Sequence, residues 1–140
     1  MVTDIRQTCP LNDFTEMLST VTKSPVFRYV VSSRPSAPIR VYSYPGVYSS
    51  HLWDVVAFFD TMHLYIDTPK PEDFRFRDTI QKTVVEFIRS SGTGISPEEW
   101  LKYPNSIALM GQNITLVDSY HKTKCKFWSA HGLTDYAWVS

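Results

Sequence analysis

His51 is the residue of this chain best suited to proton transfer near neutral pH. It follows a turn-rich stretch that includes Pro45 and Gly46, and it precedes the short apolar run from Val55 to Phe59. An imidazole has an ordinary pKa of about 6.5, so it can accept a proton as a general base. A packed segment behind the loop could orient the ring. The residue type alone leaves open a second interpretation, a surface or capping histidine.

Length and charge indicate one globular domain without a nucleic-acid partner. The chain has 140 residues, of which 43% are hydrophobic, and its acidic and basic residues balance at 14 each. No basic face therefore indicates binding to nucleic acid. No apolar run approaches the roughly 18 residues of a membrane helix, and the first residues lack the apolar core of a secretory signal. We predict a single domain over residues 1–140 with no membrane span.

Two cysteines, Cys9 and Cys125, lie near opposite ends of the chain. Two cysteines alone do not identify a disulfide scaffold. Together with the scattered His63, His121 and His131 they do not have the spacing of a zinc site, and no motif indicates another metal or a cofactor. A glycosylation sequon begins at Asn113, which would matter only in the secretory pathway.

Hydrophobic periodicity predicts a mixture of helices and strands. The predicted helices span residues 10–21, 73–88 and 120–130. The predicted strands span residues 26–31, 107–110 and 114–117, and a turn at 111–113 joins the last two in a hairpin. The near-continuous apolar run of 26–31 is typical of a strand buried on both faces of a parallel sheet. The helix over 73–88 should bury its apolar side chains, Phe74, Ile80, Val84, Phe87 and Ile88.

Four features, in this order, resemble the C-terminal part of type B carboxylesterases, the cholinesterase-like branch of the α/β-hydrolase superfamily. Residues 9–11, CPL, resemble the start of the family's helix before its penultimate core strand, and residues 27–36, FRYVVSSRPS, resemble that strand. Residues 46–59 are similar to the catalytic-histidine segment, in which an acid follows the histidine by three residues and Phe by eight. Residues 107–110 and 125–128 resemble the terminal strand and its cysteine-aromatic-Trp helix.

The resemblance implies an α/β fold in which residues 1–140 form part of an α/β-hydrolase domain: a few strands of its central sheet with flanking helices. It implies that His51 is the general base of a Ser–acid–His triad and that Asp54 is a local structural partner rather than the triad acid. It also implies a bond between Cys9 and Cys125 and an oxidising, secretory environment. Asn113 then becomes a candidate glycosylation site.

The chain departs from the family pattern in two ways. Leu52 and Asp60 stand where the family usually has glycine. The nucleophilic serine, carried by a G-x-S-x-G elbow, and the triad acid precede the histidine in this fold, and residues 1–50 contain no such motif. The glycine-rich loop of the oxyanion hole is also missing. We therefore expect the isolated chain to be inactive, and a carboxylic ester to be the substrate only of a complete enzyme.

Two functions remain open. The first is the C-terminal segment of a secreted serine carboxylesterase, which the retention of His51 and Asp54 favours. The alternative is a non-catalytic, cholinesterase-like adhesion or interaction module. In either case the strand over 26–31 would lack its upstream neighbours, so we expect exposed sheet edges to favour self-association.

Overall fold

The structure, a computed structural model, describes residues 2–40, 48–95 and 97–136 of a mixed α/β chain. The chain forms two compact units, each assembled from segments that are distant in sequence. Unit 1 comprises Met1–Arg28, Leu101–Ile107 and Val117–Ser140. Unit 2 comprises Tyr29–Trp100 and Ala108–Leu116, and it contains almost all of the sheet.

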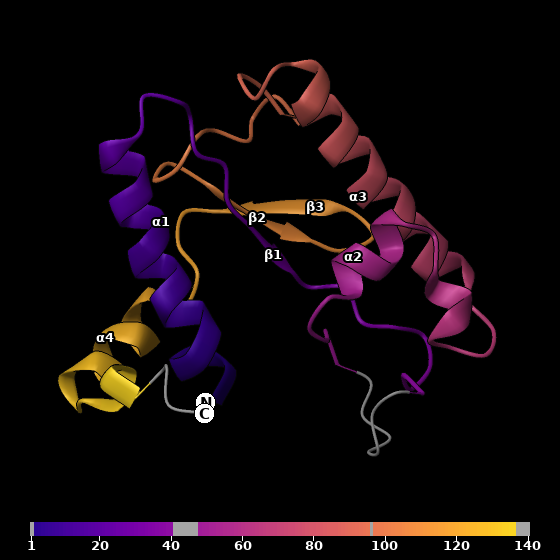
Figure 1. Cartoon of the computed structure of the whole chain (residues 1–140), viewed down its shortest axis with the longest axis horizontal. Helices are drawn as coiled ribbons and strands as arrows, with labels where there is room; N and C mark the ends of the chain where they lie inside the picture. The colour runs from indigo at the N-terminus through magenta and orange to yellow at the C-terminus, as the bar shows by residue number, and fades with distance from the viewer. Residues whose placement is uncertain (1, 41–47, 96, 137–140) are drawn as a thin grey trace. The chain divides into compact units, whose positions relative to one another are not determined.

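The sheet has three strands in the order β1 (Tyr29–Val31), β2 (Ile107–Met110) and β3 (Ile114–Val117) (Figure 1). β1 is parallel to β2, with Tyr29 opposite Ala108 and Val31 opposite Met110. β2 and β3 are the two arms of the predicted hairpin, whose turn carries a 3.1 Å hydrogen bond from the Gly111 N–H to the Asn113 carbonyl oxygen. The prediction of a mixed α/β fold and of this hairpin is confirmed.

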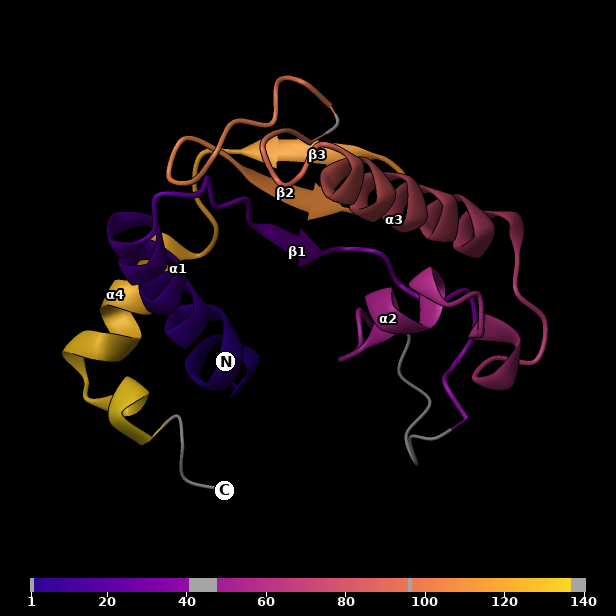
Figure 2. The same cartoon turned by 45° about the horizontal axis from the view of Figure 1, so that its top comes forward.

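β1 is shorter and more exposed than the sequence predicts. The strand expected over residues 26–31 is confirmed only at Tyr29–Val31, and the Tyr29 side chain is 41% exposed. The prediction of burial on both faces is therefore wrong. The physical reason is that β1 is an outer strand of the sheet, with β2 on one side only, so its apolar side chains lack the cover of an interior strand (Figure 2).

The long helix of unit 2, α3 (Pro71–Arg89), agrees closely with the predicted helix over 73–88. Acidic residues lie in its first turn and Arg89 in its last, an arrangement that complements the helix dipole. Its buried face is rotated from the predicted one. Phe74 and Ile88 are 39% and 66% exposed. Of the predicted set only Ile80 is fully buried, and the other buried residues of the helix are Asp73, Phe76 and Thr83.

The rotation of α3 follows from its neighbours in unit 2. The short helix α2 (Trp53–Phe58) packs on α3, and the Trp53 ring stacks on Phe76 with 6.4 Å between ring centroids. The side chains of Trp53 and Phe76 are 1% and 0% exposed, so this pair is the centre of the unit's core. The position of Trp53, rather than the average hydrophobicity of α3, determines which face of the helix is buried.

Unit 1 is helical. A short π-helix, η1 (Asp4–Thr8), leads into α1 (Cys9–Val21), and α4 (Lys122–Ala130) is followed by the 3-10 helix η3 (Leu133–Tyr136). α1 confirms the predicted helix over 10–21, whereas α4 begins two residues later than predicted and leaves Cys125 and Trp128 only half-buried. α1 and α4 lie side by side (Figure 1).

The apolar side chains of α1 are largely uncovered in unit 1. Four of them are between 52% and 70% exposed: Leu11, Phe14, Met17 and Val21. The buried residues of this helix are instead Cys9 and Thr15. Such a surface is compatible with self-association, which stays a prediction. Among the described residues, no helix has both the length and the apolar character needed to cross a membrane.

The core assignment can be tested with two phenylalanines of α3. Replacing Phe76 by Ala should lower the free energy of unfolding by about 3–5 kcal/mol, because it removes a fully buried ring that stacks on Trp53 and leaves a cavity. Replacing Phe74, the matched control, should cost less than about 1 kcal/mol, because its ring already lies partly in solvent under the Arg77 guanidinium. Urea titration followed by tryptophan fluorescence measures both. Equal losses would contradict the rotated face.

Candidate functional site

His51 lies in a turn at the start of α2, on the surface of unit 2. A 3.2 Å hydrogen bond from the Trp53 N–H to the Ser50 carbonyl oxygen closes the turn, and the Val56 N–H donates to the Leu52 carbonyl oxygen at 3.0 Å. The Trp53 side chain is buried and fixes the turn from behind. The sequence predicted a histidine in front of a packed segment, and this is confirmed only in part, because the segment buries Val56 and Ala57 but not Val55 or Phe59. The packing residue is Trp53, which the sequence reasoning missed.

The apolar run behind His51 is only partly buried. Val56 and Ala57 lie in the core, whereas Val55 and Phe59 are 42% and 66% exposed. The chain then continues into the 3-10 helix η2 (Met62–Leu64), whose Met62 is 1% exposed. The segment that carries His51 is thus anchored on one face and open to solvent on the other.

The backbone at Leu52 and Asp60 has a conformation that favours glycine. Leu52 has a φ of 65° and Asp60 a φ of 55°, both in the left-handed region. A side chain with a Cβ is strained there, and leucine is among the poorer residues for it. These are the two positions of the His51 segment at which the resembled family usually has glycine. Asp60 also forms a 3.0 Å ion pair with Arg77, which α3 provides.

Asp54 is hydrogen-bonded to a tyrosine rather than to His51. The Tyr29 hydroxyl donates to Asp54 Oδ2 at 2.7 Å and so connects β1 to α2. Although Tyr29 is 41% exposed as a residue, partial burial raises the pKa of its hydroxyl, and the hydrogen bond to the Asp54 carboxylate raises this pKa further. Tyr29 was not among the predicted site residues. Nothing in the sequence around Tyr29 indicated that its side chain would contact a residue 25 positions later in the chain.

The loop between β1 and α2 is anchored at several points. The buried carboxylate of Asp73 accepts hydrogen bonds from the Ser36 N–H (3.0 Å), the Ser36 hydroxyl and the Lys70 N–H (2.8 Å). The Ser49 hydroxyl donates to the Ser33 carbonyl oxygen at 2.6 Å. Pro45, Gly46 and Val47, which the sequence also assigns to this loop, lie outside the described residues.

The other predicted site residues lie apart from His51 in sequence and in their contacts. A disulfide joins Cys9 of α1 to Cys125 of α4, as the resemblance implies. Asn113 is exposed in the turn between β2 and β3, a position accessible to glycosylation. His121 Nδ1 lies 2.6 Å from Asp4 Oδ1 within unit 1. In the part of the chain that the structure describes, no cluster of three or more histidine, cysteine or acidic residues could hold a metal ion.

The chemistry available to His51 is limited because its ring lacks a hydrogen-bond partner among the described residues. Within residues 48–95 and the other described ranges, no hydrogen bond to the His51 ring is observed, and the nearest acid in sequence, Asp54, is engaged by Tyr29. The ring can accept or donate a proton, but in the part of the chain that the structure describes no hydrogen-bond partner orients it as a catalytic base. In comparisons with known proteins, no family model, curated protein or solved structure matches the chain.

The strain at Leu52 can be measured by substitution. Leu52→Gly should raise the free energy of unfolding by about 1 kcal/mol, because glycine adopts the left-handed region without a Cβ clash. Leu52→Ala is the matched control, since it removes the same exposed side chain but keeps the Cβ, and it should give no such gain. Chemical denaturation of the three proteins decides the point. A gain of similar size in both variants would show that the φ angle is not the cause.

The tyrosine–aspartate contact predicts a loss of stability at alkaline pH. Because the pKa of Tyr29 is raised in the folded chain, the folded state keeps a proton that the unfolded chain releases above its ordinary pKa near 10. The contribution is complete below pH 10 and is lost as the pH rises further. Wild-type protein should therefore lose more stability between pH 8 and pH 11 than Tyr29→Phe does in matched denaturation curves. Parallel losses would remove Tyr29 as a source of the pH dependence.

Proposed function

We propose that this chain is the C-terminal segment of a type B carboxylesterase-like α/β-hydrolase domain, in which His51 is the general base of the triad. In a complete enzyme the imidazole takes the proton of the nucleophilic serine during acylation and activates water during deacylation. The serine, the acid and the oxyanion hole come from residues other than 1–140. The chain alone is inactive.

The observation that carries the proposal is the backbone at Leu52 and Asp60. Both residues have positive φ angles, although neither is glycine. A positive φ is uncommon for a residue other than glycine, and rarer for leucine than for aspartate. Its occurrence at both positions that are glycine in the resembled family supports a shared path of the chain around the histidine, with the glycines replaced but the conformation kept.

The position of His51 in the topology also supports the proposal. The chain leaves β1, passes through the loop with His51 and through α2 and α3, and returns to the sheet in the parallel strand β2. In open α/β sheets, functional residues lie on loops that follow the carboxyl ends of parallel strands. His51 is on such a loop. The hydrogen bond from Tyr29 to Asp54 supports a structural role for this carboxylate, with the triad acid supplied by another segment.

Several apolar surfaces are exposed that a complete domain would cover, and this supports the proposal that residues 1–140 are only part of the domain. β1 is an outer strand although its sequence is that of an interior one, and four apolar side chains of α1 are exposed. Phe59, which matches an aromatic residue of the catalytic-histidine segment, is 66% exposed. Each of these features is costly in an independent domain and is accounted for by a neighbour that is absent from residues 1–140.

The proposal is tested first on the transcript. We expect the sequence upstream of the codon for Met1 to encode a G-x-S-x-G elbow in frame. An intact elbow with another residue in place of the serine would support the non-catalytic adhesion module instead, and the absence of any elbow-like sequence would refute the proposal.

The second test is enzymatic. Purified residues 1–140 should hydrolyse p-nitrophenyl acetate no faster than the His51→Ala variant. In the complete protein the same substitution should lower kcat by several orders of magnitude, on the order of 10⁴–10⁶, because the serine loses its base. Asp54→Asn is the matched control and should leave most of the activity. Equal activity of the complete protein and its His51→Ala variant would contradict the assigned role.

A further inference from the structure

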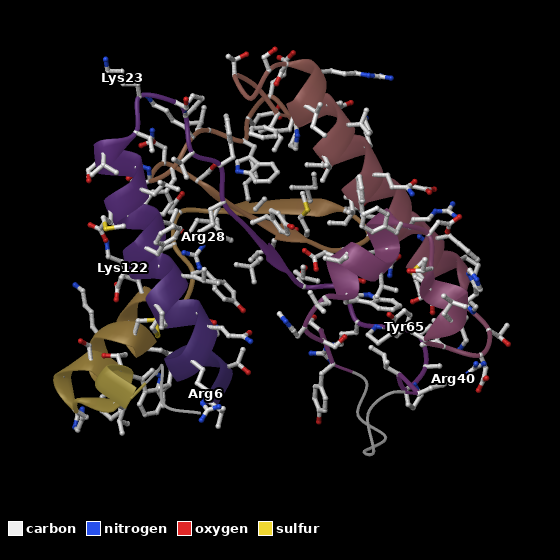
Figure 3. All side chains as sticks on the ribbon, in the orientation of Figure 1. Arg6, Lys23, Arg28, Arg40, Tyr65 and Lys122 are labelled. Atoms are coloured by element: carbon white, nitrogen blue, oxygen red, sulfur yellow. A yellow bond between two sulfur atoms is a disulfide. The ribbon has the colours of Figure 1, made fainter. Side chains whose placement is uncertain are left out.

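A buried arginine of unit 1, Arg28, has no carboxylate partner among the described residues. Its side chain extends from the segment before β1 toward α1 (Figure 3), where Nη1 donates a 3.2 Å hydrogen bond to Thr15 Oγ1. Arg28 is only 7% exposed, and in the part of the chain that the structure describes it forms neither an ion pair nor a second hydrogen bond. A guanidinium carries several N–H donors in a planar fork, so most of them remain available to another acceptor.

Burial makes this positive charge costly to the fold. A guanidinium keeps its proton in proteins, and a buried charge is tolerated when it is both paired and hydrogen-bonded. Thr15 supplies only one neutral oxygen. Burial lowers the pKa of Arg28, because the charged form loses solvation, and the neighbouring Tyr103 and Tyr120 offset this effect only in part. A negatively charged group at the remaining N–H donors would therefore stabilise the folded chain.

Two tyrosine hydroxyls are within electrostatic reach of Arg28. Burial raises the pKa of Tyr103 and of Tyr120, whereas the positive charge of Arg28 acts on both in the opposite direction. Both residues are half-buried, and neither hydroxyl has a hydrogen bond among the described residues. Because each hydroxyl keeps its proton at neutral pH, it can donate a hydrogen bond. The guanidinium and the two hydroxyls are thus neighbouring donors from three segments of unit 1.

The surrounding charges favour a group with a single negative charge. Three acids of η1 and α1 raise the pKa of one tyrosine or the other, and within the described ranges none of them is paired with Arg28: Asp4, Asp13 and Glu16. These acids would repel a dianion such as phosphate. A carboxylate neutralises the guanidinium without excess charge, and its two oxygens match the planar fork.

We propose that Arg28, together with Tyr103 and Tyr120, is a binding site for a carboxylate group. The carboxylate accepts hydrogen bonds from the guanidinium and from the tyrosine hydroxyls, and it neutralises the buried charge. Its source is either a free carboxylic acid or the side chain of an acidic residue from outside residues 1–140. The site does not depend on the proposed esterase function, because it uses none of the residues around His51.

Thermal unfolding of residues 1–140 in sodium acetate, compared with sodium chloride of equal ionic strength, tests the site. Acetate should raise the Tm of the wild type by about 2–4 °C, because it binds only the folded chain. Arg28→Met should remove this difference and be at least as stable as the wild type in chloride, since it deletes an unpaired buried charge but keeps an apolar stem. Arg34→Met, the matched control at an exposed arginine, should keep the difference. An equal acetate effect in all three proteins, or a large loss of Tm for Arg28→Met in chloride, would overturn the site.

NMR of the arginine side chains gives a second readout on the unaltered chain. During an acetate titration the Arg28 Nε–H signal should shift along a saturating curve, because a site of fixed size is being filled. The Arg34 signal should shift little and in proportion to the acetate concentration. A response of Arg28 that matches that of Arg34 would contradict a carboxylate site.

The complete protein distinguishes the two sources of the carboxylate. If an acidic side chain from outside residues 1–140 supplies it, Arg28→Met should lower the Tm of the complete protein and acetate should have no effect. If the ligand is a free carboxylic acid, acetate should stabilise the complete protein and Arg28→Met should remove that effect, as in residues 1–140. An acetate effect of equal size in the complete protein and its Arg28→Met variant would overturn the site. None of these measurements uses enzymatic activity, so a failure of the esterase proposal would leave them unchanged.

Discussion

The parallel pairing of β1 with β2 is the constraint on which the rest of unit 2 depends. Val30 lies opposite Leu109, so most of the chain separates two residues that are adjacent in the sheet. A parallel pair cannot be joined by a tight turn, and the chain between them must leave the sheet at one end and return to it at the other. The turn with His51, the short helix α2 and the long helix α3 form that return path, and α2 packs on α3 within it.

The local sequence pattern was sufficient to predict the helices and the hairpin, because apolar periodicity, helix-starting prolines and turn residues act over short stretches of the chain. α1 and α3 have strong apolar periodicity and proline in their first turn, and β2 and β3 flank a short polar turn. The burial of each element was less predictable. Phe74 and Phe76 are equally apolar, and only the place of Trp53 determines which ring enters the core. Likewise the apolar run of β1 indicates burial that unit 2 does not provide, because a strand's neighbours are set by chain topology rather than by its own composition.

The place of His51 after a loop and before a helix was predictable from the sequence, but the contacts around it were not. His51 could be singled out from its chemistry and its place after a loop, and the resemblance suggested a structural role for Asp54. The partner of that carboxylate, Tyr29, is remote in sequence and could be found only in three dimensions. The left-handed backbone at Leu52 could not be predicted from the sequence either, because leucine rarely adopts that conformation.

The carboxylate of Asp73 has a consequence for how this region can vary. It fixes Ser36 to the start of α3, while Ser49 is fastened to Ser33, so the chain on both sides of residues 41–47 is secured to the body of unit 2. The Arg40 N–H also donates to the Tyr65 carbonyl oxygen. Because the cost of closing a longer loop rises only slowly with its length, residues inserted after Arg40 should not displace the imidazole. The base of the loop, rather than its length, would then be the part of this segment most constrained in evolution.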